Sequence, residues 1–482
     1  MTDSTFPSWT CLGALGLLVA VLLSGCSFAP RLQTPSAEVA LPAQFETAPA
    51  DTLRPMTRWW SVYNEPVLER LVDTTLARNL DLRVAAARVV EVQNQYRIAR
   101  SEQYPSLGIG GDVTRTSTPS NVGFTSDVPG LPDRFDDEIY TLSGTLSFER
   151  DLWGRIRSQK NAALHEFYAT QEDYRSIQIG VLSEAIATYF ELLDLEEQLR
   201  LTEDNVLLLQ ERVERTEERY ARGLVSSFEL YSLRQEFENT RTNIPLLEAN
   251  LTDAEGRLGI VLGLYPAEAR ALLDDTRMPD LALTPIPAGL PADLLRERPD
   301  VAASMQRLEA ARQSVGAAKA SLFPSITLTT SGGLQSGELT ALVNTSQYFT
   351  SMATSLAAPL FQGGALRAQV RVSEAQYEQA IASYEKTLRV AFKEVEVTLA
   401  TYQKQQERYT ILLDERAYAE ASVQTQEERF RSGVGDYLAY LDARRNLVRV
   451  QTSLSGAARS VTDARLAVHR ALGGAWVEAP AS

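Results

Sequence analysis

The chain has 482 residues, a formal net charge of −15 at pH 7, two cysteines and two histidines, and 44% of its residues are apolar. This apolar fraction is typical of a chain that folds. The acidic balance argues against nucleic-acid binding, which needs a basic surface. Two histidines, His165 and His469, offer little for a His-rich metal site or a Ser-His-Asp triad, and two cysteines cannot form a disulfide framework.

The amino end has the features of a lipoprotein signal sequence. Residues 11–23 form an apolar run that is long enough for a signal-peptide core and too short to cross a bilayer. Leu23-Ser24-Gly25-Cys26 follows and resembles the lipobox, in which the signal is cut before a cysteine that is then acylated. We therefore expect a signal peptide at 1–25, a lipidated linker at 26–60, and an acyl and diacylglycerol lipid on Cys26. A buried free thiol near an ordinary signal-cleavage site is the alternative. By resemblance to enterobacterial sorting, Ser27 favours the outer membrane.

After the signal, no stretch approaches 18 consecutive apolar residues, so the sequence predicts no transmembrane helix in the mature chain. If the mature chain spans a membrane, it must do so as a closed β-barrel, because an open sheet edge would leave unsatisfied backbone groups in lipid.

The second half of the chain repeats the first. Residues 79–107 align without gaps with residues 298–326, and residues 219–224 align with residues 429–434. The offset falls from 219 to 210, which fits a shorter loop in the second half. Each half therefore predicts the same order of helix, strand pair, long helix, turn and long helix; chance similarity of coiled-coil composition is the alternative. The predicted segments are a first repeat at 61–265, a linker at 266–292, a second repeat at 293–473 and a C-terminal tail at 474–482.

Alternating residues predict two strands in each half, at about 105–115 and 138–149 and at about 324–334 and 347–360. In residues 140–148, aromatic, leucine and glycine residues occupy one face and serine and threonine the other. A small polar face fits a lumen, and an apolar face with aromatic residues near its ends fits lipid. A soluble antiparallel sheet with one wet face is the alternative. Polar residues at 116–136 and 333–345 predict loops between the strands.

Long helices are predicted on both sides of these strands, at 155–221 and 227–264 and at 365–431 and 437–472. An apolar residue recurs every seven positions at Ala185, Leu192, Leu199, Val206 and Val213. A sustained heptad repeat indicates helices that pack on one another with supercoiling. A free-standing coiled-coil rod would show the same repeat, but the strand pairs argue against it.

Together, these features resemble the outer-membrane factor family, the TolC-like exit ducts of tripartite efflux pumps, and its lipoprotein branch in particular. The resemblance runs from the lipobox to about residue 475 and is carried by stretches that occur in the same order. They are Arg58-Trp59-Trp60, residues 79–82, Phe148-Glu149-Arg150-Asp151-Leu152-Trp153-Gly154-Arg155, residues 219–226, residues 294–301 and Pro359-Leu360-Phe361-Gln362-Gly363-Gly364.

The resemblance implies a homotrimer of mainly α chains with membrane β-structure. Each chain would give four strands to a twelve-stranded barrel, which continues into a periplasmic α-helical coiled-coil tunnel with an equatorial collar that includes residues 266–292. Four strands cannot close a barrel around a pore, because about eight already fill with side chains. The strand count thus requires several copies, and the number three comes from the family.

The function implied is a passive exit channel of an efflux pump. It would conduct drugs or other small toxic compounds from an inner-membrane RND-type transporter and a periplasmic membrane-fusion adaptor across the outer membrane. The sequence contains no H-E-x-x-H, G-x-S-x-G or P-loop motif, so we expect neither an enzyme nor a cofactor beyond the lipid. A coiled-coil periplasmic adaptor or structural lipoprotein is the alternative. Five methionines and two histidines argue against a dedicated copper or silver route.

The turns between the long helices are the predicted gate and docking site. Gly223 and Gly433 each follow a long helix, where glycine suits the left-handed residue that ends it. Leu438 and Asp442 are four residues apart and so share a helix face. Residues 437–443 resemble the pore-constricting segment of the family, which implies an apolar ring of Leu438 and a carboxylate ring of Asp442. A solvated helical charge is the alternative for Asp442.

Three like charges repel, so closure of the channel would need donors near Asp442, and we expect Arg219 or Arg222 to supply them. The family resemblance also implies that the tips contact the adaptor. The residues expected there are Arg219, Tyr220, Arg222, Gly223, Leu224, Ser226 and Gly433.

Overall fold

The computed structural model describes residues 28–31, 60, 63, 65–119, 133–273 and 298–474. The chain forms two compact units. The first comprises Met1–Thr34, Val90–Tyr168 and Gln306–Ala382, and the second comprises Pro35–Val89, Ala169–Met305 and Ser383–Ser482. Cys26, the predicted signal peptide and nearly all of the predicted tail lie outside the described residues.

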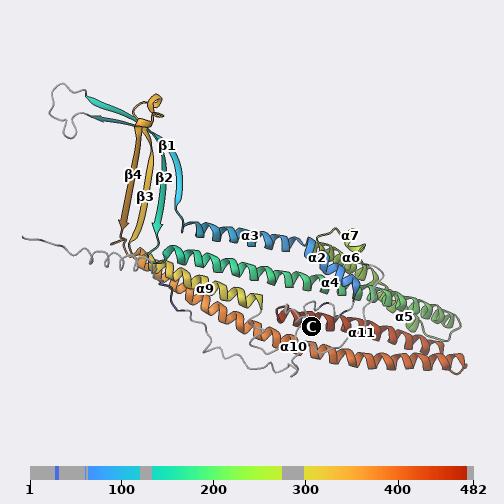
Figure 1. The fold of residues 1–482 in the computed structure, drawn as a ribbon. Helices are drawn as coiled ribbons and strands as arrows, with labels where there is room; N and C mark the ends of the chain where they lie inside the picture. Colours follow the sequence, from blue (N-terminus) through green and yellow to red (C-terminus); the bar gives the residue numbers. More distant parts are fainter. Residues whose placement is uncertain are drawn as a thin grey trace, which may run out of the picture. The chain divides into compact units, whose positions relative to one another are not determined.

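Long helices and one four-stranded sheet make up the described part of the chain (Figure 1). The helices are α2 Pro66–Arg78, α3 Leu80–Ser101, α4 Arg155–Ala221, α5 Ser227–Arg241, α6 Asn243–Leu262, α7 Pro266–Arg270, α9 Pro299–Ala320, α10 Ala365–Arg431 and α11 Tyr437–Ala471. The strands are β1 Ser106–Pro119, β2 Arg134–Arg150, β3 Ser325–Ser336 and β4 Tyr348–Ala357, with 3₁₀ turns η3 Leu339–Ala341 and η4 Thr345–Gln347 before β4. Among the described helices, none is long and apolar enough to cross a membrane.

The internal repeat is visible in the backbone. Helices α4 and α10 are both 67 residues long, and α10 begins and ends 210 residues after α4. Glycines with positive φ recur at the same offset, at Gly154 and Gly364, Gly223 and Gly433, and Gly263 and Gly473. Because a left-handed residue marks the end of a helix or a sharp turn, the two halves turn at equivalent places.

One tertiary contact is also repeated. The amide Nδ2 of Asn79 donates to the carbonyl oxygen of Val261 at 2.7 Å, and Nη1 of Arg298 donates to that of Ala471 at 2.5 Å. Asn79 aligns with Arg298 at offset 219, and Val261 aligns with Ala471 at offset 210. In both repeats, therefore, the residue before the helix that leads to the strands is fastened to the end of the last helix of that repeat.

The largest buried cluster of the second unit is formed where α4 packs against α2 and α6. Tyr189 and Phe190 of α4 are fully buried, and Leu192 from the predicted heptad row is buried in the same cluster. Side chains of α2 and α6 complete this cluster, including Leu68, Leu71, Leu258 and Leu262. In the second repeat, α10 and α11 share a cluster that contains Val395, Leu399, Tyr402, Val461 and Val468.

The structure differs from the predicted elements in several places. The helix predicted at 227–264 is wrong as a single helix, because it is divided at Thr242 into α5 and α6. Pro245 explains the division, since it has no N–H to donate and its ring would collide with the carbonyl of Arg241. Strand β4 ends at Ala357 rather than 360, since Pro359 cannot pair. Strand β1 continues to Pro119 opposite Arg134, so the predicted loop at 116–136 is paired at both ends. Strand β3 likewise continues to Ser336 opposite Tyr140, so the predicted loop at 333–345 is paired at its start.

The sheet has the order β1-β2-β3-β4, and every neighbouring pair is antiparallel. Its register puts the side chains of all four strands on consistent faces. One cross-strand row consists of Leu107, Leu146, Thr330 and Met352, and the next row, on the opposite face, consists of Gly108, Thr145, Ser331 and Ser351. The sheet therefore has one mainly apolar face and one face of small and polar residues, as the alternation predicts.

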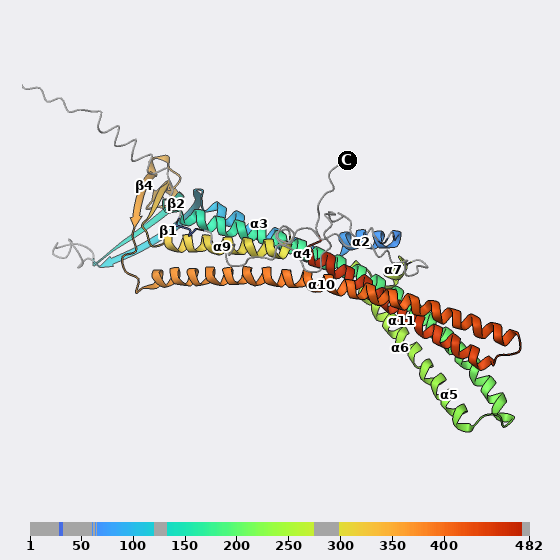
Figure 2. The same cartoon turned by 90° about the horizontal axis from the view of Figure 1, so that it is seen from below.

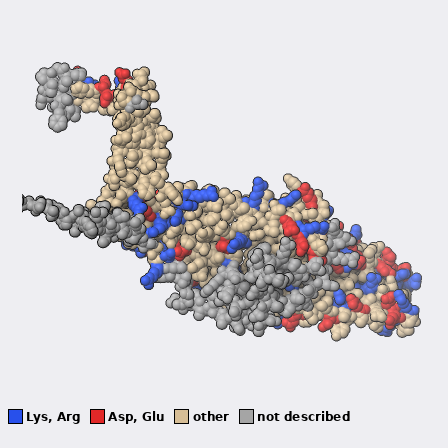
Figure 3. All heavy atoms as spheres, viewed as in Figure 1, with Lys and Arg blue, Asp and Glu red and all other residues tan. Residues whose placement is uncertain are grey.

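A wide band with a single charged residue crosses the sheet. Residues 139–148 of β2 carry no charge, and neither do β3 and β4, whereas Asp112 of β1 lies opposite Thr141 within the band. On the face of the sheet that the space-filling view shows, no Lys, Arg, Asp or Glu is seen between the two ends (Figure 3). Tyr140 and Tyr348 lie near one end of the band, and Phe148 near the other. Ten residues at about 3.3 Å each, tilted by about 40°, span about 25 Å, the height of the apolar band of outer-membrane strands.

Gly333 is required by close packing within the sheet. A Cβ at Gly333 would lie 2.0 Å from the carbonyl oxygen of Leu142 and 2.7 Å from Cα of Ser143, whereas one at Gly332 would meet nothing nearer than 3.5 Å. We expect Gly333→Ala to destabilise the protein by at least about 2 kcal/mol, because β3 must move away from β2. Thermal unfolding in detergent, followed by circular dichroism, measures this. Gly332→Ala is the matched control, and equal midpoints for the two variants would contradict the prediction.

Candidate functional site at the helix tips

Both helix-to-helix turns lie at the same end of the second unit (Figure 2). After α4, the N–H of Leu224 donates to the carbonyl of Arg219 at 2.9 Å, and Gly223 has φ of 72°. Ser226 then begins α5, where its side chain accepts from the N–H of Glu229 at 3.2 Å. Gly223 supplies the left-handed residue and Ser226 caps the next helix, so residues 223–226 form a tight turn.

The turn between α10 and α11 is built in the same way. Gly433 has φ of 75°, and the N–H of Val434 donates to the carbonyl of Arg429 at 3.0 Å. Asp436 replaces serine as the cap and accepts from the N–H of Leu438 at 3.2 Å. The second tip thus carries a carboxylate where the first carries a hydroxyl.

Asp442 lies in an ion-pair network that joins the two repeats. Nη1 of Arg212, on α4, is 2.5 Å from Oδ1 of Asp442, and Nη2 of Arg445 is 3.5 Å from the same oxygen. The guanidinium of Arg445 also pairs with the carboxylate of Glu236 on α5. Asp442 therefore faces positive charge from both its own helix and α4.

The expected donors for Asp442, Arg219 or Arg222, are wrong. Arg219 pairs instead with the capping residue Asp436 at 3.6 Å, and Arg222 lies in the exposed turn. The reason is the antiparallel arrangement of α4 and α11. Because the two helices run in opposite directions, a residue further along α11 lies beside an earlier residue of α4. Asp436 therefore lies beside Arg219, and Asp442 lies beside Arg212.

A tyrosine makes a second polar link between the repeats. The hydroxyl of Tyr437 donates to the carboxylate of Glu211 on α4, and the guanidinium of Arg215 lies 5.7 Å from the centre of its ring. Burial, together with the hydrogen bond to Glu211, raises the pKa of Tyr437 to about 12. The phenol is therefore neutral, and able to donate, throughout the physiological range.

Leu438 belongs to an apolar cluster between α4 and α11. It is partly buried against a group formed by Leu201, Leu208, Leu441 and Val448. At the tip, α4 and α11 are therefore joined both by polar contacts and by an apolar cluster. Leu438 and Asp442 lie one turn apart on α11, as their spacing predicts.

The first tip presents apolar side chains to solvent. Leu224 is 63% exposed, Phe228 is 79% exposed and Tyr231 is 62% exposed, and Tyr220 is also exposed. Phe228 and Tyr231 are three residues apart on α5 and so share a face. Tyr220 and Leu224 are among the tip residues expected from the sequence, whereas Phe228 and Tyr231 are not. Exposed apolar residues that gather in this way mark interaction surfaces.

The sequence of the chain matches a known protein family. A family model described as outer membrane efflux protein matches residues 71–264 and 290–474, which is most of the chain and covers both tips. The chain belongs to this family. The match divides at the linker between the two repeats, so each repeat corresponds to one matched segment.

Individual relatives extend over almost the whole chain. The solvent efflux pump outer membrane protein SrpC of Pseudomonas putida is 33% identical over 478 residues, which cover 96% of this chain and 98% of SrpC. The "probable outer membrane lipoprotein SilC" of Salmonella typhimurium is 29% identical and covers 96% of this chain and 99% of its own. A solved structure of the outer-membrane channel OprN has 27% identity and a TM-score of 0.83, and the alignment covers 94% of this chain and all of OprN.

The resemblance inferred from the sequence is thereby confirmed. The chain is an outer-membrane efflux channel of the kind that serves tripartite pumps, and its place is the outer membrane. Its family and relatives are channels rather than enzymes.

Proposed function

We propose that three copies of the chain form one twelve-stranded barrel that continues into a helical tunnel through the periplasm. The observation that carries this proposal is the sheet, which pairs an apolar face with a polar face and leaves β1 and β4 as edges within the described chain. Adjacent strands of the sheet alternate in direction, so β4 of one copy can pair antiparallel with β1 of the next. Lipid tolerates no open edge, so the edges must be closed by other copies.

The mass of the detergent-purified assembly tests this proposal. Native mass spectrometry is expected to give three chains per particle, and planar bilayers containing the protein are expected to show ion conductance. A monomer that does not conduct would overturn the proposal. The comparisons favour the channel over a coiled-coil adaptor lipoprotein.

We propose that the helix tips form the periplasmic gate, with rings of Leu438 and Asp442 at the closed end. The cross-repeat links of Asp442, Arg445 and Tyr437 support this, because α11 cannot move away from α4 and α5 without breaking them. In a planar bilayer, the variant with both Asp442→Ala and Leu438→Ala is expected to conduct more than the parent. Unchanged conductance would remove the gate assignment.

We propose that the exposed tips also receive the periplasmic membrane-fusion adaptor of an RND-type pump. Arg219, Tyr220, Arg222, Gly223, Leu224, Ser226 and Gly433 form or flank the two turns. The exposed Phe228 and Tyr231 extend the apolar surface along α5, which suits an apolar face of a partner helix.

We propose that Cys26 carries the lipid anchor, as the lipobox residues indicate and as the name of SilC supports. We also propose that the cargo comprises small toxic compounds such as organic solvents, because SrpC is named for a solvent efflux pump. Deleting the gene and testing susceptibility to a panel of such compounds would identify the cargo. Equal growth of the deletion strain on every compound would contradict this assignment.

A further inference from the structure

Residues 28–31 lie against helix and strand ends at the base of the sheet. Phe323, Gly316 and Arg312, which they approach, belong to the first unit, as residues 28–31 do. Phe28, Ala29 and Pro30 are half-buried, and Arg31 is exposed. These four residues form a short described segment without helix or strand. A short segment without secondary structure becomes buried in this way only where side chains hold it.

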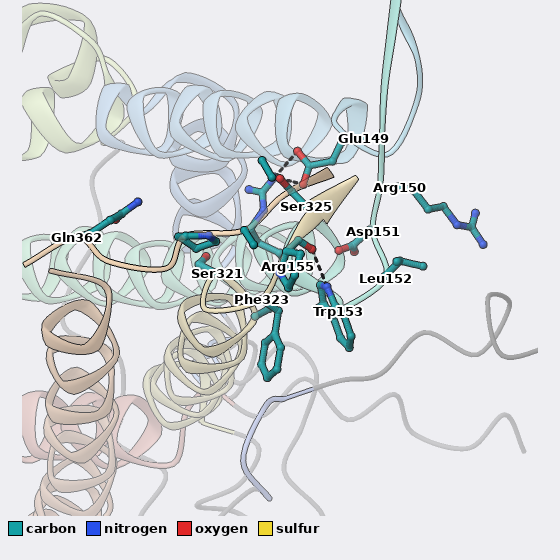
Figure 4. Close-up of a pocket in the computed structure, with 15 residues that line it drawn as sticks. Glu149, Arg150, Asp151, Leu152, Trp153, Arg155, Ser321, Phe323, Ser325 and Gln362 are labelled. Carbon is teal, nitrogen blue, oxygen red and sulfur yellow. Dashed lines mark hydrogen bonds and ion pairs between the residues drawn. The ribbon is translucent and has the colours of Figure 1, made fainter. Parts of the chain in front are cut away.

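The first hold is an aromatic stack. The ring of Phe28 is 4.8 Å from that of Phe323, with 12° between their planes, and Phe323 is 4.9 Å from Trp153. The indole Nε1 of Trp153 in turn donates to the carbonyl of Pro324 at 2.7 Å. Trp153 and Phe323 lie side by side in the close-up view (Figure 4). Trp153 lies between β2 and α4 and Phe323 lies between α9 and β3, so the stack joins the strand-to-helix junction of the first repeat to the helix-to-strand junction of the second.

The second hold is a close backbone approach at Gly316 of α9. A Cβ added at this glycine would lie 2.9 Å from the backbone nitrogen of Ala29 and 3.0 Å from its Cα. Real Cβ atoms do not approach backbone that closely, so the segment can rest on α9 only because residue 316 has no side chain.

The third hold is a hydrogen bond from a positioned arginine. Nη1 of Arg312 donates to the carbonyl of Pro30 at 2.7 Å, while Nε of Arg312 donates to both carboxylate oxygens of Glu309 at 3.0 and 2.9 Å. Burial raises the pKa of Glu309, but the hydrogen bonds and the positive charge of Arg312, with smaller contributions from Gln313 and His165, together lower this pKa below its usual value. Glu309 therefore stays ionised and keeps the guanidinium aimed at the segment.

We propose that Phe28–Arg31 is a docking strap, which fixes the point at which the lipid anchor leaves the protein. Cys26 precedes Phe28 by two residues, and two residues span at most about 7 Å. The acyl chains would therefore start beside the lowest apolar rows of the sheet, which contain Ile326 with Leu356 and Phe148 with Leu328. The anchor and the sheet would then enter the same leaflet together, with no free tether between them. This inference rests on the proposed acylation of Cys26.

Limited trypsin digestion of the full-length protein, purified from outer membranes, tests the strap. Cleavage after Arg31 creates a chain that begins at Leu32 and releases the amino-terminal residues. A protease must pull its substrate into an extended form, so a docked strap is cut slowly. Gly316→Ala is expected to raise the rate at which the Leu32 terminus appears by roughly tenfold, measured by mass spectrometry, because the new Cβ displaces Ala29.

Two further variants make the outcome decisive. Gly456→Ala on α11 adds a Cβ that meets nothing within 4 Å, so its cleavage rate should match that of the parent. Phe28→Ala removes the aromatic layer from the strap itself and leaves α9 untouched, so it should accelerate cleavage even if Gly316→Ala fails to fold. Parental cleavage rates in folded Gly316→Ala or in Phe28→Ala would overturn the strap.

The intact mass before digestion separates the strap from the acylation on which it rests. A mass that includes the lipid, together with slow cleavage, supports the whole proposal. Slow cleavage of a chain without the lipid would overturn the anchoring role while leaving the docked segment in place.

Discussion

Arg445→Ala is expected to raise the ion conductance of the channel in planar bilayers roughly ten- to a hundredfold through a larger open population. The guanidinium of Arg445 on α11 pairs with Glu236 on α5 and lies 3.5 Å from Asp442. Its loss therefore releases a link between repeats and also unmasks negative charge at Asp442. Partly exposed pairs of this kind contribute about 0.5–1 kcal/mol each, and a trimer that opens as a unit would lose three.

Arg449→Ala is the matched control. Arg449 is one helical turn further along α11, but its pair with Glu415, at 3.1 Å, lies within the second repeat, between α10 and α11. The same loss of charge should therefore leave the closed state nearly unchanged. If the two variants conducted alike, the links between repeats would not be what holds the gate shut. High salt should narrow the difference between Arg445→Ala and the parent, since it screens exposed pairs.

Arg298→Ala is expected to lower the free energy of unfolding by about 2–4 kcal/mol, towards the lower end of the range for broken buried ion pairs. The side chain of Arg298 is 7% exposed and pairs with Asp300 at 2.8 Å and with Glu394 at 2.7 Å. Burial disfavours its charge, but the hydrogen bonds to the two carboxylates and their negative charges together outweigh burial and raise the pKa of Arg298. Truncation would also leave the carbonyl of Ala471 without this donor. Both carboxylates are nearly half exposed and can rehydrate, which limits the loss.

Guanidinium unfolding of the detergent-purified protein measures the effect, with Arg389→Ala as the control. Arg389 also pairs with a glutamate, Glu385, but its side chain is 66% exposed, so its loss should cost little. The equivalent variant in the first repeat, Asn79→Ala, should destabilise in the same direction by about 1–2 kcal/mol, because a neutral amide makes the repeated contact there. Stability equal to that of the parent in Arg298→Ala would show that this contact does not hold the repeat together.

Local periodicity accounts for the elements that could be predicted from the sequence. The apolar and polar faces of β2 follow from alternation at Tyr140–Phe148, and the ends of α4 and α10 follow from glycines at 210-residue spacing. The division of the helix predicted at 227–264 could also have been predicted from the sequence, because Pro245 is a helix breaker. Family resemblance, rather than periodicity, supplied the function.

The sequence by itself therefore determined the two-fold repeat, the strand faces, the tip turns and the membership in the efflux-channel family. The tertiary structure alone decided which charges meet, since the offset between α4 and α11 pairs Asp442 with Arg212 and not with Arg219. It likewise decided that Phe28 reaches Phe323, which is far away in the chain. The physical reason is that repeats, faces and turns depend on neighbouring residues, whereas an ion pair or a ring stack depends on how two distant helices or segments are offset when they pack.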